Sequence, residues 1–407
     1  MVRKLEKMDE LLESGRIVAT AFLHDWNEKE AKEKLESQLK GEMPRVEEAW
    51  GLFNEAGKMT GSIITMPKKH IFNGHAVSVG DIHMVASLPE ERGNGNVTAM
   101  LREVLLDFKK KGYAYATLIP FSFAFYRRYG FDLAQRNMKQ RAAIEQLRNF
   151  RCDMNVRMLE LEDEVAIIRK LYDAFIQDKN LAVVKNEDDW IYRGNGEYGK
   201  PDWRNGNKHQ YTYIFRDECS NDRGYMKFIF RTGEKGPFIG EMDVQEIIYD
   251  NPKVFCQMLG FIYGMRAKLT HVNFDLLEEI DLALLLPECD DVERRLEGHF
   301  MARVLDVEKI LSLMQYPVCE GKFSIRVIDD YLTENTGSYY VKFANGKAVS
   351  IERGDSETDM TVTVDTFMQL AIGRCDLYAA LFRKGTSVAA NRDILERIFI
   401  RRAICIG

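Results

Sequence analysis

Apolar positions recur at helical spacing between residues 97 and 108, and they identify one clear amphipathic helix. Its apolar stripe consists of Val97, Met100, Leu101, Val104, Leu105 and Phe108. The segments 75–88 and 114–120 on either side are apolar and rich in β-branched residues, which is typical of strands. The pattern therefore predicts a strand, a loop, a helix that ends near Gly112 and a second strand.

The loop before this helix is rich in glycine and has the sequence Arg92-Gly93-Asn94-Gly95-Asn96-Val97-Thr98. Backbone amides at a helix N-terminus have no partner within the helix and carry partial positive charge. Glycine allows such a backbone to approach a ligand closely. The segment 92–98 is therefore predicted to hold an anionic group.

The same reading divides the 407 residues into three units, predicted to span residues 1–150, 151–300 and 301–407. In the first unit we expect helices at 9–22 and 28–40, strands at 45–53, 58–66, 75–87 and 114–120, and a short aromatic helix at 122–129. Because helices and strands mix in this way, the predicted fold class is α+β, or mixed α/β.

The second unit repeats the order of elements of the first. Its predicted elements are a helix at 161–179, strands at 209–217, 224–232 and 238–248, a helix at 252–268 and a strand at 270–277. In place of the glycine loop stands Tyr249-Asp250-Asn251-Pro252, in which Asp250 or Asn251 can cap the helix and Pro252 suits its first turn. A cap satisfies the helix amides and an aspartate repels phosphate, so the second unit is predicted to lack the anion site.

The third unit is predicted to be an α+β layer. Strands of alternating polarity are expected at 323–329, 339–345, 347–353 and 360–365, and helices at 366–372, 376–383 and 391–399. Asn345-Gly346 is typical of a hairpin turn. The sequence of this unit contains no visible catalytic motif.

Composition excludes several classes of function. The net charge is −6 with acids and bases interleaved, so nucleic acid is not an expected partner, whereas a small cationic molecule is. The apolar runs are too short to span a bilayer and the N-terminus lacks the apolar stretch of a signal peptide. We therefore expect a cytoplasmic protein without a membrane partner.

Cysteine and histidine spacing argues against a metal site. The seven cysteines are scattered, odd in number and never at C-x-x-C spacing, which predicts reduced, mostly buried thiols without disulfides or a zinc site. The seven histidines form no H-E-x-x-H or similar pair. No metal cofactor is expected.

Two motifs resemble those of a known family. Arg92-x-x-Gly95-x-Val97 resembles the Arg/Gln-x-x-Gly-x-Gly/Ala pattern of GNAT acetyltransferases, with valine where a small residue is usual. The segment 121–131, FSFAFYRRYGF, resembles the Y-x-x-x-G-F/Y ending of that fold. The whole chain is similar to the Eis-type (enhanced intracellular survival) acetyltransferases, and the segment 301–307 resembles their domain boundary. That resemblance implies a GNAT domain, a second GNAT-like domain without cofactor and a sterol carrier protein-like domain.

The resemblance also implies a set of site residues. Contacts with the pantetheine and thioester of acetyl-CoA are expected from Val85, Ala86 and Ser87. The pyrophosphate is expected to lie against Arg92, Gly93, Asn94, Gly95, Asn96, Val97 and Thr98. Phe121 and Ser122 are expected near the acetyl end, with Tyr126 as the general acid and the terminal carboxylate of Gly407 as the base.

The chemistry of acetyl transfer fits these residue types. A backbone amide near Val85 can serve as the oxyanion donor, and a tyrosine hydroxyl, with a reference pKa of about 10, can donate a proton to a thiolate. A terminal carboxylate has a reference pKa of about 3.5, so its expected role is to attract a cationic amine and pass the proton through water. The family commonly ends in an aromatic residue, whereas Gly407 has no ring to wedge its carboxylate in place.

Other interpretations stay open for single residues and for the whole chain. Tyr126 lies in a run of aromatic residues and can also be a core residue. His83 alternates with Asp81 on one strand face and is either a second candidate base or a packing residue. The expected function is acetyl-CoA-dependent N-acetylation of primary amines, such as aminoglycoside-like or polyamine-like molecules or lysine side chains, in a ternary complex. The alternatives are a carrier of apolar ligands and a catalytically degenerate scaffold that binds acetyl-CoA. The resemblance further implies a homo-oligomer, with a hexamer as its expected form.

Overall fold

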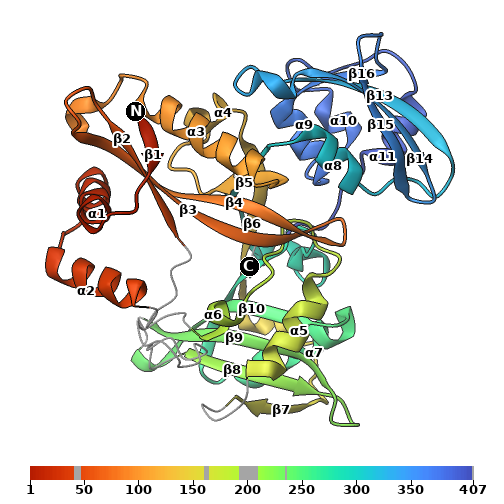
Figure 1. The fold of residues 1–407 in the computed structure, drawn as a ribbon. Coiled ribbons are helices and arrows are strands. Elements are labelled where there is room, and N and C mark those ends of the chain that lie inside the picture. Colours follow the sequence, from red (N-terminus) through yellow and green to blue (C-terminus); the bar gives the residue numbers. More distant parts are fainter. Residues whose placement is uncertain (41–46, 160–164, 192–209, 234–235, 406–407) are drawn as a thin grey trace. The chain divides into compact units, whose positions relative to one another are not determined.

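A computed structural model gives the fold of the chain and describes all residues except 41–46, 160–164, 192–209, 234–235 and 406–407 (Figure 1). The described residues form two compact units. Unit 1 combines residues 1–135 with residues 299–405, and unit 2 consists of residues 136–298. The fold is mixed α/β, as the sequence predicts.

Unit 1 begins with a mixed sheet. Its strands are, in spatial order, β1 (Val2–Lys4), β2 (Glu48–Phe53), β3 (Met59–Phe72), β4 (His75–Ser87) and β5 (Tyr115–Leu118). Neighbours from β1 to β4 are antiparallel, whereas β4 and β5 run parallel. The far side of β5 pairs with Met301–Val304 at the end of β12 (Glu293–Val304), a strand from much later in the sequence.

Helices cover this sheet and form two apolar cores. They are α1 (Met8–Phe22), α2 (Glu28–Leu39), α3 (Asn96–Lys110) and α4 (Phe123–Arg127), with a single turn η1 at Pro89–Glu91. The predicted stripe of α3 is confirmed: Val97 is partly buried, and the residues buried against strands β3, β4 and β5 are Met100, Leu101, Val104, Leu105 and Phe108. The helix α1 buries Leu11 and Ile17 in a second core with Ala49 and Ala86.

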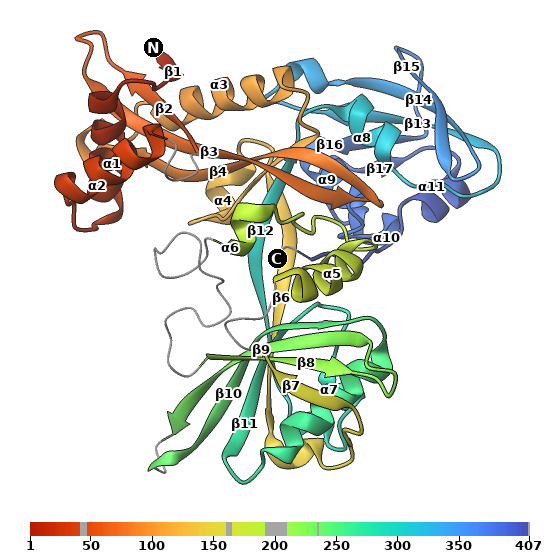
Figure 2. The ribbon, with the colours of Figure 1, turned by 60° about the horizontal axis from the view of Figure 1, so that its bottom comes forward.

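Unit 2 contains a sheet with the same order of elements as the first. The strand β6 (Asp132–Ala143) enters the unit, and next to it lie β11 (Leu269–Leu276), β10 (Gly236–Tyr249), β9 (Asp222–Gly233), β8 (Gln210–Arg216) and β7 (Asn155–Met158). Its helices are α5 (Val165–Ile176), α6 (Glu187–Ile191) and α7 (Pro252–Gly264), with turns η2 (Ile144–Leu147), η3 (Leu282–Leu284) and η4 (Cys289–Asp291). Figure 2 shows α5 and α7 on opposite faces of this sheet. The strand pair β10 and β11 is parallel, as β4 and β5 are in unit 1.

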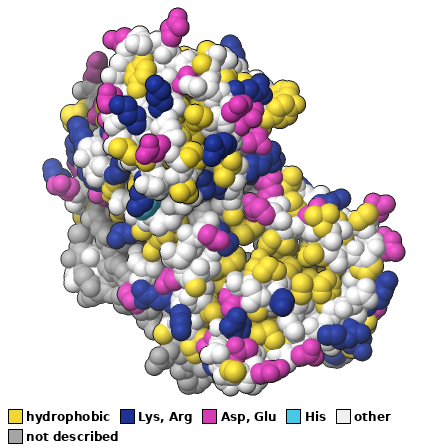
Figure 3. All heavy atoms as spheres, turned by 90° about the vertical axis from the view of Figure 1, so that its right-hand side faces the viewer, with side chains coloured by type: hydrophobic (Ala, Val, Ile, Leu, Met, Phe, Trp, Pro, Cys, Tyr) yellow, Lys and Arg dark blue, Asp and Glu magenta, His cyan; other side chains and the backbone are white. Residues whose placement is uncertain are grey.

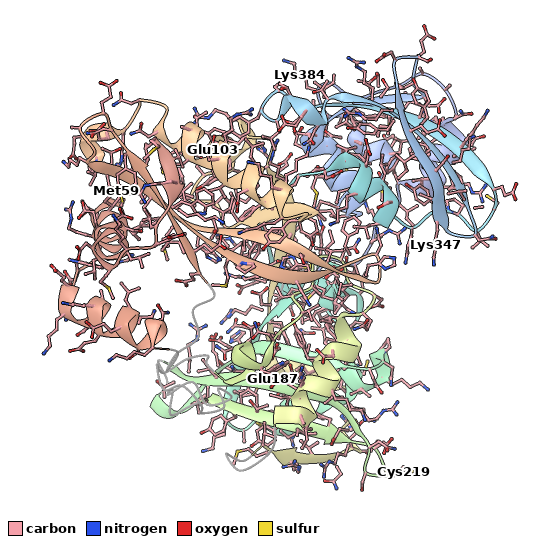
Figure 4. The ribbon with its side chains drawn as sticks, in the orientation of Figure 1. Met59, Glu103, Glu187, Cys219, Lys347 and Lys384 are labelled. Atoms are coloured by element: carbon pink, nitrogen blue, oxygen red, sulfur yellow. The ribbon has the colours of Figure 1, made fainter. Side chains whose placement is uncertain are left out.

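The C-terminal part of unit 1 has its own sheet. Its order is β15 (Lys347–Gly354), β14 (Gly337–Ala344), β13 (Gly321–Ile328), β16 (Met360–Thr363) and β17 (Ser387–Val388). Its helices are α8 (Val307–Leu313), α9 (Val364–Ala371), α10 (Leu377–Ala380) and α11 (Arg392–Ile398), with a turn η5 at Thr333–Asn335. The predicted hairpin turn is confirmed, because Asn345 and Gly346 have φ of 52° and 81° between β14 and β15. Figure 4 shows Lys347 at this turn.

The cysteines correct one prediction. All seven are free, as expected, but the expectation that most are buried is wrong, since only Cys375 is buried. Cys219 and Cys319 are exposed in connections between elements, and Cys289 is exposed at the start of the short turn η4. Figure 4 shows Cys219 at the end of the hairpin of β8 and β9.

The surface carries charges of both signs. Figure 3 shows lysine and arginine side chains interspersed with aspartate and glutamate over one face of the molecule. Among the helices that the structure describes, none combines the length and the apolar character needed to cross a membrane. In the same described residues, no group of three or more His, Cys, Asp or Glu side chains is arranged to hold a metal ion.

Candidate functional site

The ladder between the parallel strands β4 and β5 ends before β4 does. Their ladder runs from Gly80–Ala116 to Ile82–Leu118, and β4 continues beyond it to Ser87. At Met84 the backbone adopts φ of 46°, and the register with β3 shifts at the same place. A bulge of this kind redirects the backbone of a strand. The predicted residues Val85, Ala86 and Ser87 therefore lie on the part of β4 beyond its ladder with β5.

The first turn of α3 has no side-chain cap. Gly95 is the N-cap residue with φ of 76°, and no side chain accepts a hydrogen bond from the helix amides that follow. The side chain of Asn96 instead donates to the carbonyl of Glu91 at 3.1 Å. A Cβ atom on Gly93 or Gly95 would meet no atom within 4 Å, so open space faces both glycines. These uncapped amides and exposed glycines fit an anionic group such as a pyrophosphate.

The corresponding helix of unit 2 is capped. The side chain of Asn251 accepts hydrogen bonds from the amides of Lys253 at 2.9 Å and Val254 at 3.3 Å, and Pro252 occupies the first turn. Of the two caps that the sequence allows, Asn251 is the one used. The donors that α3 presents to solvent are therefore already occupied in α7.

Tyr126 lies on α4, which follows the end of β5. The hydroxyl of Ser122 caps this helix and accepts a hydrogen bond from the amide of Phe125 at 3.3 Å. Tyr126 is 3% exposed, and its ring centroid lies 5.6 Å from that of Phe121 and 6.2 Å from that of Phe131. Burial, with a smaller effect of Tyr129, raises the pKa of Tyr126 to about 12. The hydroxyl therefore remains protonated at neutral pH.

The structure brings the predicted segments together around one core. Tyr126 shares its apolar cluster with Ile82 and Leu118 at the end of the β4–β5 ladder, and Val85 and Val97 pack against the same cluster. Arg92, Gly93, Asn94 and Gly95 are exposed in the loop that leads into α3. Phe121 is 72% exposed, next to Ser122. The strand end, the glycine loop and the tyrosine are thus neighbours in the fold.

His83 belongs to a charged cluster on β4. Its Nε2 lies 2.9 Å from Oδ2 of Asp81, which also pairs with Nζ of Lys68 at 2.5 Å, while the hydroxyl of Thr117 donates to Oδ1 at 2.8 Å. Burial raises the pKa of Asp81, but the bond from His83 and the charge of Lys68 outweigh it and hold that pKa well below its usual value. The side chain of His83 is 33% exposed. Lys68 and Thr117 could not be found from the sequence, because each lies on a different strand.

The terminal residue Gly407 lies outside the described residues. Among the residues that the structure describes, the site contains a candidate proton donor, Tyr126, and a candidate base, His83. Ser87 adds a buried hydroxyl that has no hydrogen-bond partner in the part of the chain that the structure describes. A buried hydroxyl of this kind at the end of β4 is suited to a polar atom of a bound molecule.

Family comparisons agree with this geometry. The model of a family described as Acetyltransferase (GNAT) domain matches residues 2–134, and a second model with the same description matches residues 182–304. The model described as Sterol carrier protein domain matches residues 307–405. No curated protein sequence matches the chain.

Solved structures share the fold over the whole chain. A conserved protein of unknown function from Enterococcus faecalis V583, named a probable N-acyltransferase, has a TM-score of 0.82 at 21% identity and covers 99% of this chain and 98% of its own. A GCN5-related N-acetyltransferase from Anabaena variabilis has a TM-score of 0.81 at 19% identity, with coverage of 100% and 99%. Eis1 from Mycobacterium abscessus has a TM-score of 0.79 at 15% identity, also with coverage of 100% and 99%. The chain thus contains two tandem segments that match GNAT acetyltransferase domains and a C-terminal segment that matches a sterol carrier protein domain, and it shares its fold with Eis1.

Proposed function

We propose that the chain transfers the acetyl group of acetyl-CoA to a primary amine, by direct attack of the amine within a ternary complex. GNAT domains imply acetyl-CoA as co-substrate and an acceptor for its acetyl group. The observation that carries the proposal is the uncapped N-terminus of α3 at Gly95. The first turn of this helix packs, through Val97, against the apolar core that contains Tyr126. An anion-binding helix end next to a buried phenol suits a phosphate-bearing thioester.

Three segments are proposed to bind acetyl-CoA. The amides from Gly93 to Thr98, together with Arg92, hold the pyrophosphate. The backbone of Val85, Ala86 and Ser87 meets the pantetheine where β4 has left β5. Phe121 and Ser122 lie near the acetyl end. The capped helix α7 supports the further proposal that the second GNAT domain binds no acetyl-CoA.

The proposed reaction needs no covalent enzyme intermediate. The amine nitrogen forms a bond to the thioester carbonyl carbon while the backbone amide of Val85 stabilises the negative charge on the carbonyl oxygen. The bond between carbon and sulfur then breaks, and the hydroxyl of Tyr126 donates its proton to the thiolate. The proton lost by the amine passes to a base. The base then returns this proton through water to the Tyr126 phenolate, so the products are an amide and coenzyme A and both enzyme groups are restored.

Burial makes Tyr126 a weaker acid than an unperturbed tyrosine. The pKa of Tyr126 is about 12, whereas a thiol such as cysteine has a reference pKa of about 8.5. The pKa of an unperturbed tyrosine, about 10, is closer to that of the thiol than the raised pKa of Tyr126 is. The buried hydroxyl therefore acts first as a hydrogen-bond donor to the developing thiolate, and completes the proton transfer only as the thiolate forms.

Two groups are candidates for the base. The proposed one is the carboxylate of Gly407, which attracts a cationic amine and passes its proton through water. His83 is the alternative, because Asp81 holds its ring at 2.9 Å and a third of its side chain is exposed.

The acceptor is proposed to be a small cationic amine of the aminoglycoside or polyamine type, or a lysine side chain. The net charge of −6 favours such acceptors over anionic ones. We also propose domains at 1–150, 151–300 and 301–407, a cytoplasmic location and a homo-oligomer, with a hexamer as the form to test first.

Calorimetry and a thiol-release assay test the proposal. Coenzyme A and acetyl-CoA should both bind to the full chain, and a panel of primary amines should release free thiol in steady turnover. Binding without thiol release from any amine would support the degenerate scaffold instead. Binding of an apolar fluorescent probe without affinity for coenzyme A would support the carrier that the sterol carrier protein domain suggests.

A further inference from the structure

A loop of the C-terminal domain contacts the first turns of α3. The hydroxyl of Tyr331 donates a hydrogen bond to the backbone carbonyl of Thr98, a residue 233 positions earlier in the sequence. In return, the guanidinium of Arg102 donates to the carbonyl of Tyr331 at 2.9 Å. Both contacts lie within the first two turns of the helix whose N-terminus is proposed to hold the pyrophosphate.

Tyr331 also packs against the segment that follows Tyr126. Its ring centroid lies 5.1 Å from that of Tyr129 at an interplanar angle of 66°, a favourable edge-on contact. The hydroxyls of Tyr129 and Thr98 lie 3.1 Å apart, within hydrogen-bond distance. Thr98, Tyr129 and Tyr331 therefore form a closed triangle that joins α3, the end of α4 and the C-terminal domain.

The loop that carries Tyr331 is fixed from within its own domain. The carboxylate of Asp329 accepts hydrogen bonds from the amides of Tyr331 at 3.1 Å and Leu332 at 2.9 Å, and from the side chain of Asn335 at 3.0 Å. Lys109, near the end of α3, donates to Asn335 at 2.8 Å. A loop with so many internal bonds holds one conformation and can orient what it touches.

A buried arginine connects this loop to the same end of α4. Arg303 is fully buried, pairs with Asp329 at 2.7 Å and donates to the carbonyl of Tyr129. Gly130 allows this approach, because a Cβ atom there would clash with the guanidinium of Arg303, and its φ is 77°. The C-terminal part of unit 1 thus contacts α3 and the segment that follows α4.

We propose that Tyr331 is a positioning residue for the acetyl-CoA site, which makes the C-terminal domain a working part of that site. The inference rests on the proposed function. Tyr331 fixes the first turn of α3 relative to the segment that bears Tyr126, so that the pyrophosphate donors and the phenol keep one geometry. A misplacement of about 1 Å in such a geometry is enough to lower the rate about 100-fold.

The test compares two variants of Tyr331 with two of Tyr340. Tyr340 is a matched control, since its hydroxyl also donates to a backbone carbonyl of the C-terminal domain, that of Ser356 at 2.6 Å, without contact to α3. Tyr331→Phe removes the hydroxyl and keeps the ring, so the Kd for coenzyme A should rise by about threefold to tenfold, the effect of one neutral hydrogen bond. Tyr331→Ala removes both and should raise Kd and the KM for acetyl-CoA further, with the KM for the amine unchanged. Tyr340→Phe and Tyr340→Ala should keep the wild-type values.

A measurement without ligand separates positioning from general stability. In Tyr331→Ala, hydrogen exchange of the amides from Thr98 to Arg102 should accelerate, while that of the C-terminal sheet stays as in the wild type. Wild-type Kd values and exchange rates in both Tyr331 variants would overturn the inference and leave the proposed function standing. Absence of coenzyme A binding in the wild-type chain would overturn both.

Discussion

The side chains of Arg303 and Asp329 form an ion pair at 2.7 Å whose partners are 0% and 1% exposed. Arg303 belongs to the strand that completes the first sheet, and Asp329 belongs to the C-terminal domain. The carboxylate also satisfies the amides of Tyr331 and Leu332. Neither charge has access to water, so each depends on the other.

Removal of one partner should therefore destabilise unit 1 strongly. Asp329→Ala leaves a buried guanidinium without a counter-charge and is expected to lower the free energy of unfolding by about 3–5 kcal/mol in urea denaturation. The adjacent Asp330 is exposed, and Asp330→Ala should change stability by no more than about 0.5 kcal/mol. Equal stabilities of the two variants would contradict the structural role of the pair.

Tyr126→Phe should lower turnover and leave binding of acetyl-CoA almost unchanged. The substitution keeps the buried ring and removes the proton donor, so kcat should fall by about 100-fold or more. Steady-state thiol release gives kcat, and calorimetry gives the Kd. Tyr113→Phe, at a partly buried tyrosine that packs on Phe108 of α3, is the control and should retain activity. Unchanged turnover in Tyr126→Phe would remove the hydroxyl from the mechanism.

Gly95→Glu should abolish binding of coenzyme A. It places a carboxylate at the end of α3 that is proposed to attract pyrophosphate, and the two negative charges repel each other. Gly57→Glu is a matched control, because Gly57 has the same φ of 76° and also faces open space. Calorimetry on both variants separates the charge effect from backbone strain, and retained binding in Gly95→Glu would show that the pyrophosphate lies elsewhere.

A C-terminal extension and the substitution His83→Gln distinguish the two candidate bases, because each change should lower activity for only one of them. If the Gly407 carboxylate acts, a short peptide added after Gly407 should lower kcat by about 100-fold, and His83→Gln should have little effect. The same peptide added before Met1 serves as the control for bulk. Loss of activity in His83→Gln with an active C-terminal extension would instead assign the base to His83.

His70 should make the stability of unit 1 depend on pH. Burial lowers the pKa of His70 to about 4, although the charge of Asp81 opposes that effect. The unfolded chain takes up a proton on this histidine near its reference pKa of about 6.5, whereas the folded chain does so only near pH 4. The stability contributed by the neutral ring is thus complete above pH 6.5 and decreases by about 3 kcal/mol as the pH falls to 4.

Urea denaturation between pH 7.5 and pH 4 measures the slope of the free energy of unfolding against pH. Each unit of difference between the folded and unfolded pKa of His70 contributes roughly 1.4 kcal/mol. The slope should decrease in His70→Gln, whatever the absolute stability of that variant, and should stay as in the wild type in His24→Gln, at an exposed histidine. An identical slope in wild type and His70→Gln would show that the buried ring does not control the pH dependence.

Local patterns predict the elements whose apolar positions are periodic or whose turns have a characteristic sequence. The stripe of α3 and the hairpin at Asn345-Gly346 follow from spacing and turn chemistry alone. The strands β6 and β12 were missed, since both are rich in charged residues. Arg136 of β6 pairs with Glu278, 142 positions away, and Arg141 pairs with Glu241, 100 positions away. A local sequence pattern cannot indicate partners at such separations.

Some residues of the candidate site could be predicted from local sequence, whereas others are brought together only by the fold. The glycine loop and Tyr126 belong to continuous motifs, so the sequence could indicate them. The partners of Asp81 lie on β3 and β5, and the contact of Tyr331 with Thr98 spans two domains. Long-range contacts of this kind depend on tertiary packing, which no single segment encodes.

The strand β12 sets an order for the synthesis of the chain. Residues 301–304 pair with β5, so the last neighbour of Tyr115–Leu118 leaves the ribosome only after the whole of unit 2 has been made. Until then the free edge of β5 can pair with a strand of another molecule. Unit 2 is therefore synthesised while the first sheet is still incomplete, and any product that terminates before Met301 keeps that edge open.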